Sequence, residues 1–126
     1  MSAPQITHVG TVIVPVADLD EALAFYTGTL GFEVRIDAEF APGQRWIEVA
    51  PPGAQTSLAL VPHDSAPAGI EVSLATANAE ADHAELRTRG VEADPELIRM
   101  GEGVPPMFTF RDPDGNRFRM VERGEQ

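Results

Sequence analysis

The chain has 126 residues, of which 43% are hydrophobic and 23% are charged. This length and composition predict one compact domain over residues 1–126 with an ordinary hydrophobic core. Nine basic residues stand against twenty acidic ones, and the net charge is -11. Such a surplus of negative charge repels phosphate groups, so we expect neither nucleic acid nor an anionic membrane as a partner.

Cysteine is absent, which excludes disulfides, thiolate nucleophiles and zinc–thiolate sites. The first residues lack the basic and apolar segments of a signal peptide, and no apolar run reaches the roughly 18–20 residues that a membrane span needs. These features lead us to expect a cytoplasmic protein.

The first part of the chain predicts a strand, a helix and three further strands. β-branched residues dominate the segment from Ile6 to Val16, which favours a strand covered on both faces. Asp18 followed by Glu21 is typical of a helix start, because a carboxylate there accepts hydrogen bonds from first-turn amides. Gly31 is suited to end that helix. The further strands are predicted over residues 32–38, 45–50 and 56–61.

A polar segment with Pro and Gly, residues 62–69, predicts a connector, after which the same order restarts. Asn78 is suited to begin a second helix and Gly90 to end it. Asp112-Pro113-Asp114-Gly115 fits a type I turn between two late strands. The strands of this second part are predicted over residues 70–76, 91–98, 106–111 and 117–121.

An internal repeat relates the two parts. The helix starts Asp18 and Asn78 lie sixty positions apart, and the helix ends Gly31 and Gly90 depart from that shift by one. The modules so defined are residues 5–61 and 70–122. Neither is large enough to fold alone. We therefore expect an α+β fold in which two βαβββ modules form an eight-stranded, cup-like mixed sheet around a cavity, with an approximate two-fold axis.

Three motifs carry a resemblance to a known family. They are Val16-Ala17-Asp18-Leu19, then Phe25-Tyr26 with Leu30-Gly31-Phe32, and the late Asp112-Pro113-Asp114-Gly115-Asn116. Over nearly the whole chain the sequence resembles the vicinal oxygen chelate superfamily, which includes glyoxalase I, extradiol dioxygenases and bleomycin-binding proteins. The resemblance implies a glyoxalase-like fold and a homodimer, and leaves open whether each cup is completed within one chain or between two.

The resemblance also implies four strand positions for metal ligands, here Thr11, Ala59, Glu71 and Arg119. Only Glu71 is a usual ligand, and a guanidinium beside a divalent ion would repel it. We therefore expect no metal and no other cofactor. In place of an ion we predict a buried Glu71–Arg119 pair, whose disruption would cost about 3–5 kcal/mol.

The three histidines do not complete a metal site by their spacing. His8 is an odd number of residues from Thr11 on the predicted strand and is expected on the opposite face. His83 is expected to pack on the second helix, and His63 lies in the connector.

A ligand site without metal is still expected in the cup, since aromatic walls with a few polar groups are typical of small-molecule sites. Besides the four positions above, the candidate ligand-binding residues are Ile13, Trp46, Ser73, Phe108 and Phe110. The sequence favours a metal-independent small-molecule-binding protein of the glyoxalase/bleomycin-resistance type that sequesters a cationic or aromatic compound.

Two alternatives stay open at this point. The first is a glyoxalase-like lyase, isomerase or dioxygenase. It would use metal through an unforeseen ligand set, or work without metal with Glu71 as base and Arg119 steering an oxyanion. The second is an interaction module that binds no small ligand.

Overall fold

The computed structural model describes residues 4–63 and 69–123, and its elements follow the predicted order. In module one they are β1 (Thr11–Val16), α1 (Leu19–Ala24), η1 (Phe25–Thr29), β2 (Glu33–Ala41), β3 (Gln44–Ala50) and β4 (Ser57–Pro62). In module two they are β5 (Glu71–Thr76), α2 (Ala79–Thr88), β6 (Glu92–Ala93), β7 (Met107–Arg111) and β8 (Arg117–Glu122). Most of the predicted connector, residues 64–68, lies outside the described residues.

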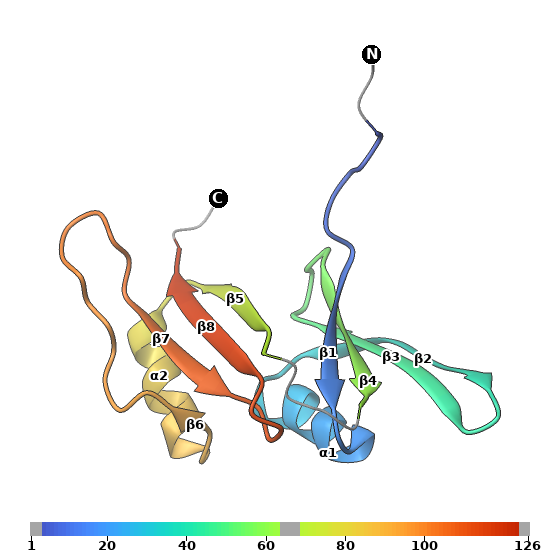
Figure 1. The fold of residues 1–126 in the computed structure, drawn as a ribbon. Helices are drawn as coiled ribbons and strands as arrows, with labels where there is room; N and C mark the ends of the chain where they lie inside the picture. Colours follow the sequence, from blue (N-terminus) through green and yellow to red (C-terminus); the bar gives the residue numbers. More distant parts are fainter. Residues whose placement is uncertain (1–3, 64–68, 124–126) are drawn as a thin grey trace.

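The strands form two four-stranded mixed sheets, one from each module. The strand orders are β1-β4-β3-β2 and β5-β8-β7-β6, so the two sheets have the same topology. In each sheet the first strand runs parallel to the last, and the other pairs are antiparallel. The predicted glyoxalase-like α+β fold of two similar modules is confirmed. Within one chain, the eight strands form two separate sheets that lie beside each other (Figure 1).

Both helices begin and end as predicted. Asp18 Oδ1 accepts a hydrogen bond from the amide of Glu21 at 3.1 Å, and Asn78 Oδ1 accepts one from the amide of Ala81 at 3.0 Å. Gly31 follows the first helix with φ 78°, in the left-handed region that glycine adopts without a steric penalty. Gly90, with φ 82°, has the same role after the second helix.

The first helix changes from α to π geometry in its second half. Over η1 the hydrogen bonds span five residues, as in the bond from the amide of Leu30 to the carbonyl of Phe25 at 3.0 Å. The second helix has no such segment. A π turn takes up one residue more than an α turn, and this accounts for the one-residue offset between Gly31 and Gly90 in the repeat.

Two predicted strands are longer than the observed ones. Of the strand expected over residues 91–98, only β6 pairs as a strand. It is followed by an isolated bridge between Ile98 and Met107. Pro95 falls in this stretch and has no amide hydrogen to donate to a strand ladder. The segment before β1 extends away from the body as an arm, on which Ile6 is 82% and Val9 66% exposed (Figure 1).

The two modules meet through their helix-bearing sides. The buried ring of Tyr26 on η1 lies 5.9 Å from that of Phe118 on β8. Its hydroxyl donates a hydrogen bond to Asp112 Oδ2 at 2.7 Å, within the turn between β7 and β8. Burial raises the pKa of Tyr26, and the charge of Asp112 adds to the effect. The hydroxyl therefore stays protonated and acts as a donor.

The predicted turn at Asp112–Asn116 joins the modules. Its closing bond runs from the amide of Gly115 to the carbonyl of Asp112 at 3.0 Å. Asn116 Nδ2 donates to the carbonyl of Pro15 at 2.7 Å, and Asp114 Oδ1 accepts from the amide of Ala17 at 3.0 Å. Both partners lie at the end of module one's first strand, so this turn fixes how the modules sit against each other.

In the part of the chain that the structure describes, no helix is long and apolar enough to cross a membrane.

Candidate functional site

Each sheet has one side covered by helix and one open side, which we call its open face. On β3, Ile47 and Val49 are fully buried against the helix, so the alternating residues Trp46 and Glu48 lie on the open face. On β8, Phe118 is fully buried on the helix side, which places Arg117 and Arg119 on the open face. The residues expected to surround a ligand are therefore divided between two surfaces.

The open face of module two carries the predicted ion pair. Arg119 Nε lies 3.3 Å from Glu71 Oε2, and Arg117 Nη2 lies 3.6 Å from Glu71 Oε1. The Glu71–Arg119 pair therefore forms, and Arg117, which the sequence reasoning missed, joins it. Arg117 could have been found from its place two residues before Arg119 on the same strand.

Within a single chain the pair is not buried, contrary to the prediction. The side chains of Glu71 and Arg119 are 38% and 40% exposed. Glu71 is the first residue of β5, the edge strand of its sheet, and nothing in the described part of the chain covers its open side. Ion pairs with this exposure typically contribute only about 0–1 kcal/mol, so the expected cost of about 3–5 kcal/mol is too large.

The open face of module one holds the other two predicted positions, Thr11 and Ala59. Thr11 pairs with Ser57 across β1 and β4, and Ala59 pairs with Ile13, which is 55% exposed. Ala59 itself is 0% exposed, so the prediction that it contacts a ligand is wrong for this chain. Among the interactions of residues 4–63 and 69–123, no hydrogen bond or ion pair joins Thr11 or Ala59 to Glu71 or Arg119. The four positions thus form two half-sites in one chain.

Glu48 is the most strongly held carboxylate of module one's open face. It accepts hydrogen bonds from Ser57 Oγ at 2.5 Å, from the indole Nε1 of Trp46 at 2.7 Å, and a long one from Thr11 Oγ1 at 3.4 Å. The pKa of Glu48 is lowered, most by the hydrogen bond from Ser57 and next by that from Trp46. Sequence reasoning missed this residue, although the alternation Trp46-Ile47-Glu48 places its side chain beside Trp46.

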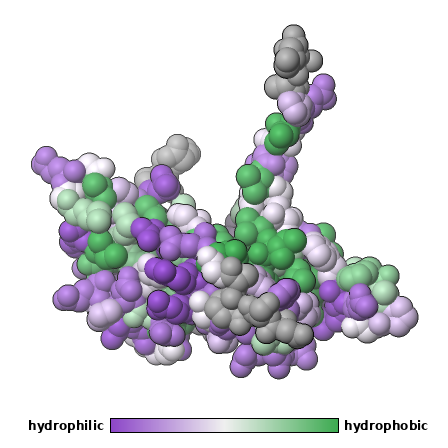
Figure 2. All heavy atoms as spheres, viewed as in Figure 1, coloured by the Kyte–Doolittle hydropathy of each residue, from purple (hydrophilic) through white to green (hydrophobic). Residues whose placement is uncertain are grey.

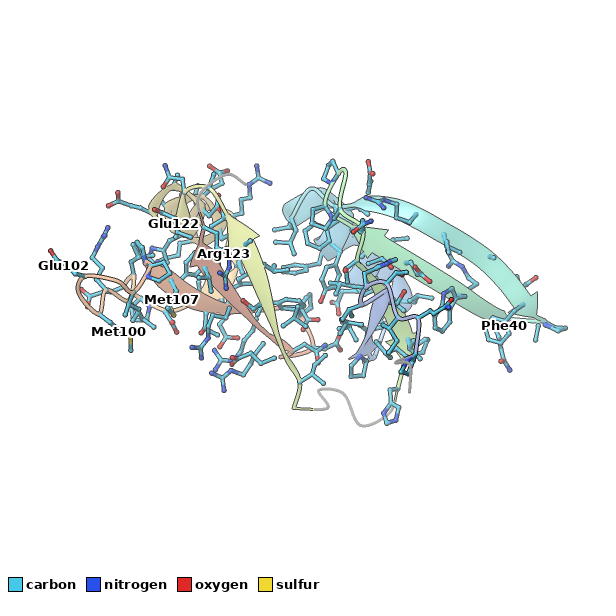
Figure 3. All side chains as sticks on the ribbon, turned by 90° about the horizontal axis from the view of Figure 1, so that it is seen from above. Phe40, Met100, Glu102, Met107, Glu122 and Arg123 are labelled. Carbon is cyan, nitrogen blue, oxygen red and sulfur yellow. The ribbon has the colours of Figure 1, made fainter. Side chains whose placement is uncertain are left out.

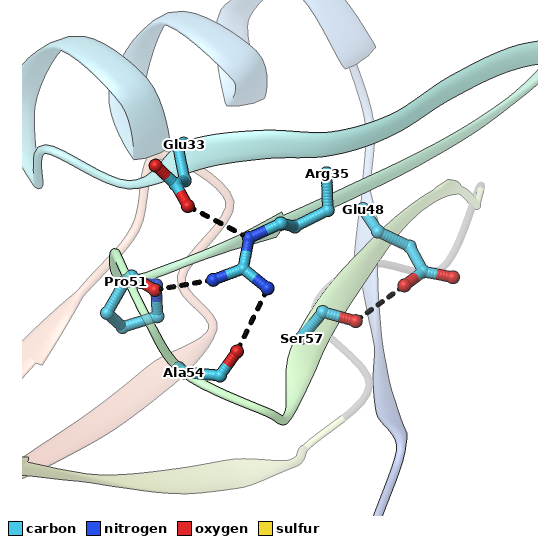
Figure 4. Close-up of polar contacts among 6 residues, drawn as sticks. All are labelled: Glu33, Arg35, Glu48, Pro51, Ala54 and Ser57. Atoms are coloured by element: carbon cyan, nitrogen blue, oxygen red, sulfur yellow. Dashed lines mark hydrogen bonds and ion pairs between the residues drawn. The ribbon is translucent and has the colours of Figure 1, made fainter.

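The start of β4, and hence Ser57, is positioned by Arg35 on β2. Its guanidinium donates to the carbonyls of Pro51 and Ala54 at 2.9 Å each and contacts Glu33 at 3.1 Å. These hydrogen bonds hold the loop between β3 and β4 against β2, an edge strand of the sheet. Figure 4 shows this arrangement together with the bond from Ser57 to Glu48.

A hollow of about 380 Å³ lies in module one, where the β2–β3 hairpin and the end of β4 come close to the start of α1. Its lining residues are Leu19, Phe40, Gly43, Gln44, Arg45, Trp46, Val61 and Pro62. Trp46 belongs both to this wall and to the hydrogen-bonded group around Glu48. Phe40 is 65% exposed and stands near the end of the β2–β3 hairpin (Figure 3). Trp46 is therefore the predicted ligand-binding residue that the structure places in a cavity wall.

Phe108 and Phe110 are not cavity walls, and that prediction is wrong. Both side chains are fully buried on the helix side of their sheet, where Phe110 stacks on Phe118 at 5.3 Å. In the register of β7 and β8, Thr109 pairs with Arg119, so the phenylalanines on either side of Thr109 point the other way.

His83 has the packing role that the sequence indicates. Its ring meets that of Phe108 edge-on at 5.0 Å, and Nε2 donates a hydrogen bond to the carbonyl of Asp94 at 2.7 Å. The remaining candidate, Ser73, is exposed on β5 and pairs in register with Arg119, so it lies beside the ion pair.

The residues at the four positions that the resemblance implies do not fit a divalent metal ion. Of the four implied positions, only Glu71 supplies a usual donor, and it contacts two guanidinium groups. Within residues 4–63 and 69–123 there is no group of three or more His, Asp or Glu side chains that could hold an ion.

Two four-stranded sheets of this topology, related by an internal repeat, define a glyoxalase-like protein. The sequence profile of the Glyoxalase/Bleomycin resistance protein/Dioxygenase superfamily matches residues 5–120, and the chain belongs to that superfamily.

Several proteins are similar over nearly the whole chain. The antibiotic binding protein TnmS3 from Streptomyces sp. CB03234 is 35% identical, with 97% of this chain and 100% of that one covered and a TM-score of 0.82. A superfamily member from Sphaerobacter thermophilus DSM 20745 is 36% identical, with 95% and 100% covered and a TM-score of 0.85. The uncharacterized protein YetH of Bacillus subtilis (strain 168) is 34% identical, with 93% of this chain and 99% of YetH covered.

Proposed function

We propose that this chain is a small-molecule-binding protein that holds a planar aromatic ligand without metal and without breaking a bond. The observation that carries the proposal is the hollow of about 380 Å³ with Trp46 and Phe40 in its wall. A volume of this order and an aromatic wall with few polar groups are typical of small-molecule sites. The similarity to TnmS3, which is described as an antibiotic binding protein, points to the same class of activity.

Binding of acridine, a neutral planar probe near neutral pH, tests this function. Trp46 is the only tryptophan in the chain, so its fluorescence reports directly on the proposed site. We expect saturable quenching and a raised melting temperature, because a ligand that binds only the folded state stabilises it. Trp46→Ala, followed by calorimetry because the fluorophore is lost, should weaken binding about tenfold or more.

Phe25→Ala is the matched control for this experiment. Phe25 is also a partly exposed aromatic residue of module one, and it lines a different hollow of about 250 Å³. Its truncation should leave acridine binding unchanged. A wild-type protein with no quenching and no thermal shift, or a Phe25→Ala variant that loses binding as fully as Trp46→Ala, would contradict the proposal.

The protein is further proposed to act as a homodimer in which module one of one protomer faces module two of the other. The open face of module one leaves apolar side chains exposed, among them Ile13 at 55% and Ile36 at 41%. Figure 2 shows apolar side chains gathered where β1 and its N-terminal arm leave the body. A second copy of the chain is the occupant that would bring the two half-sites into one cup.

Sedimentation velocity of wild type and two arginine variants tests the dimer. Ile13→Arg places a charge on the open face and should give a monomer, while Ala24→Arg, on the exposed side of α1, should leave the dimer intact. Ile13 is more than half exposed within one chain, so its replacement should cost little stability in the protomer. A monomeric wild-type protein at micromolar concentration would refute this arrangement.

A further inference from the structure

We propose that the open face of module two binds an oxyanion, a carboxylate or a phosphoryl group, between the side chains of Arg111 and Arg117, with Arg119 beside them. All three arginines alternate along β7 and β8 with phenylalanines that are fully buried on the helix side. The site involves neither the hollow in module one nor Trp46, so it goes beyond the function proposed above.

A row of four charges crosses the sheet of module two. In the strand register, Arg117 on β8 is directly opposite Arg111 on β7. Glu71 on β5 is the outer neighbour of Arg117, and Glu92 on β6 is the outer neighbour of Arg111. Like charges that face each other across neighbouring strands are destabilising. An anion bound at the middle of the row would relieve the repulsion between the two arginines.

The outer carboxylates leave the donors of these two guanidinium groups unused. Arg111 Nη1 lies 3.8 Å from Glu92 Oε2, and Arg117 Nη2 lies 3.6 Å from Glu71 Oε1. Both distances are too long for a hydrogen bond, and within residues 4–63 and 69–123 neither arginine donates one. Each guanidinium carries five N–H donors. The pair can therefore bind a ligand without breaking any hydrogen bond of the chain.

Arg119 adds a buried donor that lacks a partner. Its Nε lies 3.3 Å from Glu71 Oε2 but makes no hydrogen bond in the described part of the chain. Its Nη1 contacts the sulfur of Met107 at 3.9 Å, and a thioether is a weak acceptor. A buried donor without a partner costs free energy until a ligand or a water molecule satisfies it. An oxygen atom of a bound anion would be such a partner.

The charge balance and the exposure of this face also favour an anion. Three of the nine basic residues of the chain lie here, against the two carboxylates that contact them. The net charge of the whole chain is -11, but charges farther away than about 8–10 Å are largely screened at physiological ionic strength. The side chains of Arg111, Arg117 and Arg119 are 36%, 49% and 40% exposed, so a ligand can reach them.

The shape of the guanidinium group sets the chemical class of the ligand. Its planar fork of N–H donors matches the oxygens of a carboxylate or a phosphoryl group, which it binds through two parallel hydrogen bonds. A neutral amide of the same size offers one acceptor oxygen and no negative charge. The site should therefore discriminate strongly between an acid and its amide.

Three probes with one phenyl ring and different head groups test the site. Near neutral pH, phenyl phosphate and benzoate are anions, and benzamide is neutral. Titration of the wild-type protein at constant ionic strength, followed through the nitrogen–proton signals of the arginine Nε groups, gives each dissociation constant. We expect at least one anion to bind about tenfold or more tightly than benzamide, because charge-assisted hydrogen bonds are made only to the anions. The order of the two anions shows whether the site prefers a phosphoryl group or a carboxylate.

Arginine variants locate the binding. Arg117→Gln removes one guanidinium from the middle of the row and should weaken binding of the anions about tenfold, and Arg111→Gln should do the same. Arg99→Gln is the matched control, because Arg99 is a 60% exposed arginine of module two that pairs with Glu80 on α2. Its loss should change the affinity about twofold or less. Thermal melting checks that each variant is folded.

The outcomes separate this site from the function proposed above. Equal binding of the three probes, or binding of none, would overturn the oxyanion site, whereas acridine binding would still decide the role of the hollow. An affinity that falls as far in Arg99→Gln as in Arg117→Gln would overturn it too, because only long-range attraction would then be at work. Anion binding that appears in Ile13→Arg but not in wild type would show that a partner protomer occupies the arginines, which also contradicts the proposal. If a variant does not fold, the wild-type comparison of the probes still decides, since it needs no variant.

Discussion

The two modules share one backbone plan but differ on their open faces. Both sheets have the same strand order, and both helices begin at a side-chain cap and end before a glycine. On module one the open face carries Ile13, Trp46 and Glu48, whose carboxylate is held by neutral donors. On module two it presents Arg117 and Arg119 around Glu71. The comparison teaches that the repeat preserves packing, whereas the chemistry of the faces has diverged.

The largest expected effect tests the packing side of this comparison. Phe110→Ala removes a fully buried ring that stacks on Phe118, and it should destabilise the fold by about 3–5 kcal/mol. Urea unfolding followed by circular dichroism measures this free energy. A loss below about 1 kcal/mol would mean that Phe110 lines an accessible cavity, as the sequence first indicated.

Substitutions at the contact between the modules should destabilise the fold nearly as much. Asp112 accepts hydrogen bonds from Tyr26 Oη and from the side-chain and main-chain nitrogens of Asn116, and it is 4% exposed. Asp112→Ala leaves these buried donors unpaired and should cost about 3 kcal/mol or more. Tyr26→Phe removes one of the bonds and should cost about 1.5–3 kcal/mol in the same unfolding experiment. Equal and negligible losses in both variants would show that the modules are held by other contacts.

A much smaller effect is expected on the open face of module two. Arg119→Met breaks an ion pair whose side chains are more than a third exposed, so the free energy of unfolding of the protomer should fall by about 1 kcal/mol or less. Glu71→Gln is the reciprocal variant and should behave in the same way. Losses of about 3 kcal/mol in both, measured under conditions that keep the protein dimeric, would indicate that a partner chain buries the pair.

The smallest expected effect is the contribution of Glu48, on the open face of module one, to the loss of stability in acid. Because the folded-state pKa of Glu48 is lowered, its contribution to stability is fully present above the ordinary glutamate pKa of about 4.3. That contribution is lost as the pH falls through the lower, folded-state value. Between neutral pH and the acid limb, wild type should therefore lose slightly more stability than Glu48→Gln. Parallel stability curves for the two proteins would show that the hydrogen bonds from Ser57 and Trp46 do not favour the ionised form.

Most of the backbone could be predicted because short-range rules specify it. The caps at Asp18 and Asn78, the glycines after both helices and the turn at Asp112–Asn116 depend on residues a few positions apart, and all are found. Two strands were exceptions: the first begins only at Thr11, and the one expected over residues 91–98 is interrupted at Pro95.

Less of the candidate site could be predicted from the sequence, because the site depends on which side of each strand faces the helix. The register across the β7–β8 turn pairs Thr109 with Arg119, and this pairing alone excludes Phe108 and Phe110 from the open face. Glu48 was missed because its donors, Ser57 and Thr11, come from two other strands. Such a group becomes visible only when the register of β1, β4 and β3 is known.

The π-helical segment η1 has a consequence for how proteins of this kind can change length. Between the cap and the terminating glycine, the first helix holds one residue more than the second, and the added residue is absorbed inside the helix. The sheets on either side keep the same strand order. After duplication of a module, a single-codon insertion or deletion could thus be tolerated in the helix, leaving the strands free to diversify by substitution alone.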